Sequence, residues 1–96
     1  MKAFEDIPFN NIDTPKGIQA LLSFGDEYEL SIVKTDFSYG GDRGLYEIGV
    51  FKNNQMVEMP GITAENDTVK GFLDEQEVLG ILVKMQTATG YAPEKA

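Results

Sequence analysis

The sequence predicts an α+β fold, a curved antiparallel sheet of four or five strands with one C-terminal helix packed on one face. Runs of alternating apolar and polar residues flank short turns near residues 25 and 53, which is typical of two hairpins. An apolar stripe at helical spacing follows a capping sequence at residue 74. The chain has 96 residues, 42% hydrophobic and 25% charged, which suits a single domain over residues 1–96.

The first 16 residues show no clean period, so we expect an irregular N-terminal arm over residues 1–16. The arm mixes large apolar side chains with polar residues and two prolines. The apolar residues are Phe4, Ile7, Phe9 and Ile12. Such residues favour packing of the arm on its own domain over docking on a second subunit.

Residues 17–73 are expected to be mostly β-structure, starting with a hairpin. Residues 18–24 alternate in polarity, Gly25-Asp26-Glu27 interrupts the run, and residues 28–35 resume it. A helix over residues 14–24, starting at Pro15, is the competing prediction, because a short apolar run is ambiguous by period alone.

A second hairpin is predicted over residues 45–59. Its strands, 45–52 and 55–59, are joined by Asn53-Asn54, and asparagine tolerates the left-handed backbone conformation that tight turns require. Residues 69–73 are expected to add a short fifth strand.

The C-terminal helix is predicted over residues 74–89, with Asp74 and Glu77 as a capping box and Gly90 as the stop. Gly80 weakens the helix interior, and close packing on the sheet is the expected reason. Residues 90–96 are expected to form a loose tail. The stripe assigned to the core consists of Val78, Ile81, Leu82 and Met85, extended by Ala88.

The composition excludes several kinds of chemistry. The chain has no cysteine, which excludes disulfides, thiolate metal sites and cysteine nucleophiles. It has no histidine, the commonest general base and metal ligand. The serines form no nucleophile elbow, and the acidic residues have no EF-hand spacing. We therefore expect a protein that is not an enzyme, with no catalytic residues, metal or cofactor.

The charge points to a particular kind of partner. Eight basic and sixteen acidic side chains give a net charge of −8. Such a chain repels phosphate backbones and anionic membrane surfaces, so neither nucleic acid nor membrane is an expected partner. A basic or nucleic-acid-binding protein would be attracted instead. The first residues carry acids where a signal peptide needs an apolar run, so a cytoplasmic location is expected.

Two segments are candidate partner-binding sites. The first is a glycine-rich loop that offers side chains favoured at binding hot spots, and it comprises Tyr39, Gly40, Gly41, Asp42 and Arg43. The second is the acidic turn of the first hairpin, which comprises Asp26, Glu27 and Glu29. The loop glycines are also explained by a bend between strands, and the acids by solvated turns. A further alternative is that Gly40, Gly41 and Arg43 contact a phosphate.

Two short motifs carry a resemblance. SYGGDRGLYE at residues 38–47 and DTVKGFLDEQEV at residues 67–78 are similar to sequences of small uncharacterised acidic proteins encoded by tailed bacteriophages. The similarity covers roughly residues 30–85. It implies a viral accessory protein in the cytoplasm of a bacterial host, and it brings no activity or site residues with it.

These observations lead to one main functional hypothesis and two alternatives. The main hypothesis is a small acidic binding protein that inhibits a host protein concerned with defence or with handling nucleic acids. One alternative is a structural or assembly protein, associated with the virion and homo-oligomeric. The other is a protein that sequesters a small molecule or nucleotide.

Overall fold

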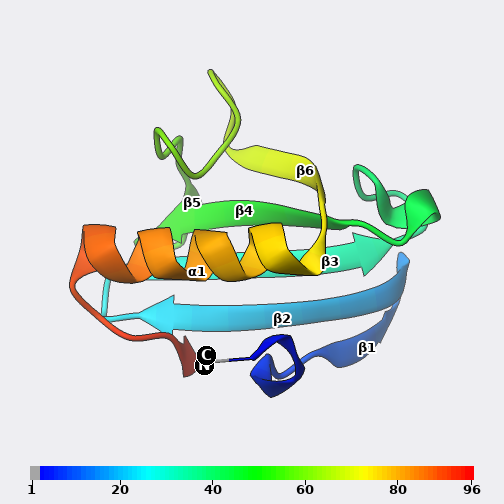
Figure 1. Ribbon diagram of the computed structural model, residues 1–96, viewed down its shortest axis with the longest axis horizontal. Coiled ribbons are helices and arrows are strands. Elements are labelled where there is room, and N and C mark those ends of the chain that lie inside the picture. Colours follow the sequence, from blue (N-terminus) through cyan, green and yellow to red (C-terminus); the bar gives the residue numbers. More distant parts are fainter. Residues whose placement is uncertain (1–2) are drawn as a thin grey trace.

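The computed structural model describes residues 3–96, which form a curved antiparallel sheet with one α-helix packed across one face, as predicted (Figure 1). The strand order is β1-β2-β3-β4-β5; in addition, β6 pairs with β4 and β7 pairs with β2. The strands are β1 (Asn10–Asp13), β2 (Lys16–Phe24), β3 (Tyr28–Thr35), β4 (Tyr46–Lys52), β5 (Gln55–Met56), β6 (Val69–Leu73) and β7 (Glu94–Lys95). The helix is α1 (Glu75–Thr89), and two short 3₁₀ turns are η1 (Phe4–Asp6) and η2 (Gly41–Arg43).

The first hairpin forms as a pair of strands, and the helix considered for residues 14–24 is absent. Strand β2 pairs with β3 from Gly17 opposite Thr35 to Phe24 opposite Tyr28. Every second side chain of β2 then enters the core, including Leu22 and Phe24. Side chains of β2 alternate between the core and the other face of the sheet. The residues therefore follow the strand period of two rather than the helical period that the sequence also allowed.

The N-terminal segment is more regular than expected. Its residues Asn10–Asp13 form β1, paired with residues 16–19 of β2. The prediction of an irregular arm over residues 1–16 is therefore wrong for these four residues and for Lys16, which begins β2. The rest of the segment packs on its own domain: Ile7 is buried, and the rings of Phe4 and Phe9 lie 5.1 and 5.6 Å from the ring of Tyr46.

The end of the C-terminal tail is attached to the sheet, so the prediction of a loose tail over residues 90–96 is wrong for residues 94–96. Glu94 and Lys95 pair with Ser23 and Leu22, and the Ala96 N–H donates to the Leu21 carbonyl at 3.1 Å. Strand β1 covers only the first half of the outer edge of β2, and β7 takes the other end. The short polar tail has no period that could reveal such a pairing.

Helix α1 begins and ends where the sequence predicts. Asp74 accepts a hydrogen bond from the Glu77 N–H at 2.8 Å, and Glu77 accepts one from the Asp74 N–H at 3.1 Å. Gly90 closes the helix with a φ of +79°. The four residues of the expected core stripe are buried. Ala88, in contrast, is exposed.

The prediction that close packing on the sheet explains Gly80 is wrong. A Cβ at Gly80 would meet no heavy atom within 4 Å, so close packing on the sheet does not require a glycine there.

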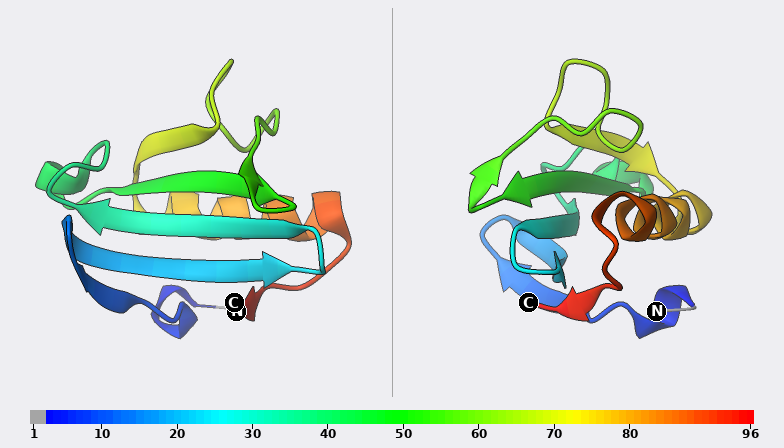
Figure 2. Two further views of the ribbon diagram at one scale, coloured as in Figure 1. Left: turned by 180° about the vertical axis from the view of Figure 1, so that it is seen from behind. Right: turned by 90° about the vertical axis from the view of Figure 1, so that its left-hand side faces the viewer.

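The core lies between α1 and one face of the sheet, whereas the opposite face is open (Figure 2). The strand register places Gln19, Val33 and Glu47 side by side on this open face. All three residues are half-buried. The open face is therefore a mixed polar and apolar surface. Within residues 3–96, no helix has the length and apolarity needed to cross a bilayer.

Candidate functional site

The structure separates the two predicted binding segments. The loop with Tyr39 to Arg43 follows the end of β3, whereas Asp26 and Glu27 precede its start. An eight-residue strand such as β3 spans about 25 Å, so the segments lie at opposite ends of the sheet. Glu29 lies on the open face, opposite Ser23 and Phe51. These residues do not form one site.

The glycine-rich loop is held by side chains at its start. The Thr35 hydroxyl oxygen accepts hydrogen bonds from the N–H groups of Phe37 at 3.2 Å and Ser38 at 3.0 Å. The Ser38 hydroxyl oxygen accepts one from the Thr35 N–H at 2.9 Å. Reciprocal bonds of this kind fix the backbone of a turn. The loop is therefore preorganised.

The loop glycines are required by the backbone conformation and close packing of the bend. Gly40 has a φ of +91°, and a Cβ at Gly41 would overlap the Thr35 carbonyl oxygen. The Gly40 carbonyl accepts hydrogen bonds from the N–H groups of Arg43 and Leu45, at 3.0 and 2.9 Å. The Gly41 N–H donates to the Ser38 carbonyl at 3.0 Å. The loop thus lacks the row of free N–H groups on which the phosphate-binding alternative depends.

A bulge in β6 brings a further aromatic residue to this loop. Gly71 and Phe72 together lie opposite Glu47, because Tyr46 pairs with Leu73 and Ile48 with Lys70. The Phe72 N–H donates to the Tyr39 carbonyl at 3.0 Å rather than to β4. Its backbone has a φ of +57°. A bulky residue is a genuine outlier in this left-handed region.

Two aromatic rings and one arginine gather at this end of the sheet, and the exposed Phe37 precedes Tyr39 and Arg43 in the same loop. The rings of Tyr39 and Phe72 are nearly parallel, with centroids 6.5 Å apart, and the Arg43 guanidinium carbon lies 5.8 Å from the Phe72 centroid. Phe37, Tyr39 and Phe72 are 84%, 58% and 53% exposed. We call this group, consisting of Phe37, Tyr39, Arg43 and Phe72, the aromatic–arginine surface.

The sequence indicates Tyr39 and Arg43 of this surface as candidate binding residues. It does not indicate Phe37 or Phe72. Phe37 lies two residues before Tyr39, outside the glycine-rich segment Tyr39 to Arg43. Phe72 directly precedes the core residue Leu73 in a strand. A period of two counted from Leu73 places Phe72 away from the core, and this is the signal that could have found it.

The acidic turn of the first hairpin borders a shallow hollow. Asp26 and Glu27 are exposed, and they line a shallow hollow of about 320 Å³ together with Phe24, Tyr28, Thr89 and Tyr91. The Glu27 carbonyl accepts a hydrogen bond from the Asn53 N–H at 2.8 Å, so the turn is tied to the second hairpin. The carboxylates themselves lie in water, as in an ordinary hairpin turn.

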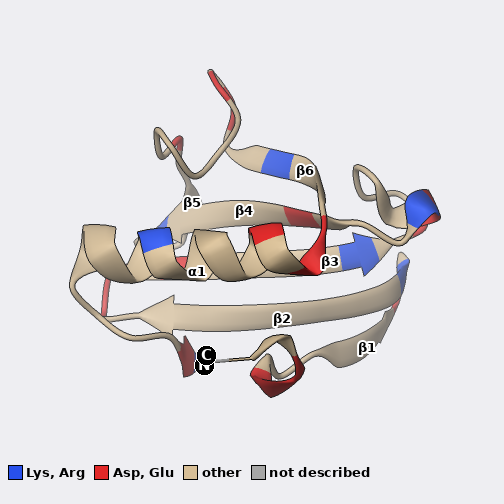
Figure 3. Ribbon diagram, viewed as in Figure 1, with Lys and Arg blue, Asp and Glu red and all other residues tan. Residues whose placement is uncertain are grey.

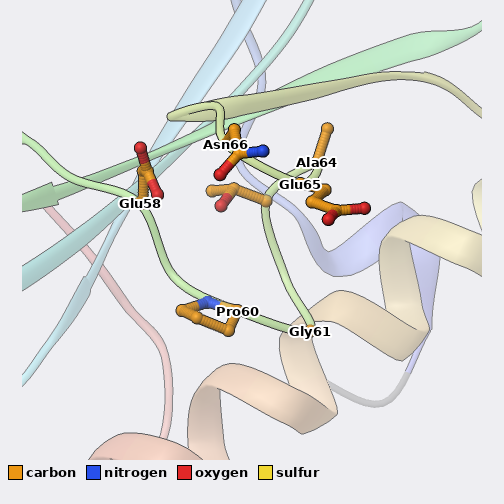
Figure 4. A pocket seen from close by; sticks show the side chains of 7 residues that line it. Glu58, Pro60, Gly61, Ala64, Glu65 and Asn66 are labelled. Atoms are coloured by element: carbon orange, nitrogen blue, oxygen red, sulfur yellow. The ribbon is translucent and has the colours of Figure 1, made fainter.

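Another hollow, of about 260 Å³, lies within the long loop between β5 and β6 (Figure 4). Glu58 and Glu65 contribute carboxylates on opposite sides of it. Two separated carboxylates are a weak donor set for Mg²⁺ or Ca²⁺. In residues 3–96, no group of three or more His, Cys, Asp or Glu side chains lies close enough to hold a metal ion.

The acidic residues are spread over several parts of the molecule (Figure 3). They occur in η1, at the start of α1, in the β5–β6 loop and in the β2–β3 turn. The net charge of −8 acts on charged partners at long range, as a field of the whole molecule.

Comparisons with protein-family models, with curated proteins and with solved structures give no match for this chain.

Proposed function

We propose that this chain is a non-enzymatic protein-binding module whose partner docks on the aromatic–arginine surface. The proposal is supported mainly by the exposed ring and the strained backbone of Phe72. Its side chain is half exposed although its backbone occupies a left-handed conformation, which costs of order 1–3 kcal/mol for a residue of this kind. The ring is turned away from the core, so core packing does not account for this conformation.

The composition of the surface supports a protein partner. Tyrosine and arginine are enriched at the centres of protein interfaces, where a few rigid anchors carry most of the binding energy. The hydrogen bonds of Thr35, Ser38 and Glu47 fix the loop before a partner arrives, so little conformational entropy is lost on binding.

The resemblance to phage proteins and the net charge of −8 narrow the class of partner. We propose a basic protein of the bacterial host cytoplasm, such as one concerned with defence or with handling nucleic acids. The chain would inhibit this partner by covering part of its surface. Complementary charge would speed the encounter.

Affinity purification from a bacterial lysate, followed by mass spectrometry, tests this proposal. We expect the wild-type chain to recover a specific partner, and the double variant Tyr39→Ala/Phe72→Ala to recover at least about ten-fold less. Tyr91→Ala is the matched control, because Tyr91 is as exposed as Tyr39 but lies near the acidic turn.

Circular dichroism must show that all variants remain folded. The proposal fails if no specific partner is recovered, or if the double variant recovers as much of it as the Tyr91→Ala control.

A further inference from the structure

A shallow depression on the open face adjoins the aromatic–arginine surface. It has a volume of about 400 Å³, within the usual range for ligand pockets of roughly 300–1,000 Å³. Ile12, Pro15 and Phe37 line it, and β2, β3 and β4 contribute Gln19, Val33 and Glu47. The Tyr39 N–H of that surface donates to the carboxylate of Glu47, which lines the depression, so a partner seated on the aromatic–arginine surface would reach the depression.

Glu47 is the one charged side chain among the residues that line the depression. It is half-buried, and its Oε1 accepts a hydrogen bond from the Tyr39 N–H at 2.7 Å. This bond fixes the position of the carboxylate. A carboxylate has about four acceptor positions, so the group retains capacity for further donors. A fixed, partly desolvated negative charge without a lysine or arginine in the same lining is suited to a cation from outside.

We infer that the depression accepts one arginine side chain of the partner, an inference that rests on the proposed function and specifies its partner further. The aliphatic stem would pack on Ile12, Pro15 and Val33, and the guanidinium would meet the Glu47 carboxylate. The exposed Phe37 ring offers a face for the planar guanidinium.

Arginine fits this depression better than other side chains do. An apolar side chain would remove Glu47 from water without giving it a partner, which is unfavourable. An acidic side chain would be repelled. Lysine carries the right charge, but its ammonium is more strongly hydrated and cannot stack on Phe37 as a plane.

Titration of the isotope-labelled full chain with N-acetyl-arginine amide, followed by NMR amide shifts, tests the inference without any host partner. We expect saturable shifts at Tyr39 and Glu47. The uncharged analogue N-acetyl-citrulline amide is expected to cause none, and N-acetyl-lysine amide is expected to bind more weakly.

The decisive variant is Glu47→Gln, whose amide oxygen can still accept the Tyr39 N–H. We expect it to weaken binding of the arginine probe by about ten-fold. Glu29→Gln is the matched control, because Glu29 is a half-buried acid of the same face that does not line the depression, and it should leave binding unchanged.

The possible failures are distinguishable. The inference is overturned if the arginine probe does not bind, if citrulline or lysine binds equally well, or if Glu47→Gln has no more effect than Glu29→Gln. Binding of the probe to Phe72→Ala should remain, because Phe72 does not line the depression. Probe binding without any recovered host partner would leave the depression established and count against the proposed function alone.

Discussion

Phe72 combines two properties that rarely occur together in one residue. Its φ of +57° belongs to a region that L-residues avoid because Cβ approaches the following carbonyl oxygen, and its ring is half exposed. Neighbouring contacts maintain this conformation. The Tyr39 carbonyl accepts a hydrogen bond from the Phe72 N–H, and Gly71 leaves room for the Tyr39 backbone and side chain. The strain is local, so it can be tested with single substitutions.

We predict that Phe72→Gly is more stable than Phe72→Ala, by about 1 kcal/mol in free energy of unfolding. Both changes remove the ring, but only glycine relieves the left-handed strain. Urea denaturation of the two variants measures the difference. In an ordinary strand, glycine would instead be the less stable of the two by roughly 0.5–1 kcal/mol. A lower stability for Phe72→Gly would therefore contradict the strained conformation.

Among the elements, α1 agrees most closely with its sequence signals. Its cap, core stripe and stop are all local in sequence, within one or two turns of the residues they affect. The two glycines of this region nevertheless have different roles. Gly80 lies in the helix interior with open space where its Cβ would be, and Gly90 ends the helix in the left-handed conformation.

We predict that Gly80→Ala stabilises the protein by about 0.5–1 kcal/mol, because alanine loses less backbone entropy in a helix and meets no obstruction here. Gly90→Ala is the matched comparison. It is also free of steric contact, but its φ of +79° makes alanine unfavourable, and we expect a loss of about 1 kcal/mol.

Thermal unfolding followed by far-UV circular dichroism gives both values. If Gly80→Ala lowered the unfolding temperature, the open space around that position would be in doubt.

For the whole molecule, the net charge of −8 and the dispersed acids define how a basic partner would associate. Charges spread over a surface act at long range and are screened once the Debye length falls below about 10 Å, near 0.1 M salt. Close contacts at the aromatic–arginine surface are far less sensitive to salt. The association rate should therefore depend on salt concentration more strongly than the dissociation rate does.

We predict that the association rate with the recovered partner falls about ten-fold or more between about 50 and 500 mM salt, while the dissociation rate changes much less. Surface plasmon resonance measures both rates. Equal sensitivity of both rates would indicate that charged contacts, rather than the aromatic rings, hold the complex.

The sequence predicts the hairpins, β6 and the helix because each depends on residues close together in the chain, although the strand predicted over residues 55–59 ends at Met56. The alternation of β2 and β3, the Asn53-Asn54 turn and the Asp74 cap are such cases, and the positive φ values of Asn53 and Asn54 agree with the turn. The sequence also indicates Tyr39 and Arg43 as candidate binding residues for a local reason, because both occur in one glycine-rich loop.

The edge pairings and the candidate site required the tertiary structure. Strand β7 exists because β1 leaves part of the edge of β2 free, and this depends on residues more than seventy positions apart. Phe72 reaches Tyr39 through a bulge opposite Glu47. Glu47 lines the same depression as Ile12 only after β1, β2, β3 and β4 are in register. Local patterns determine which elements form, because their energies arise within a turn or a strand. Pairing between distant segments decides which side chains meet, and no short stretch of sequence contains that information.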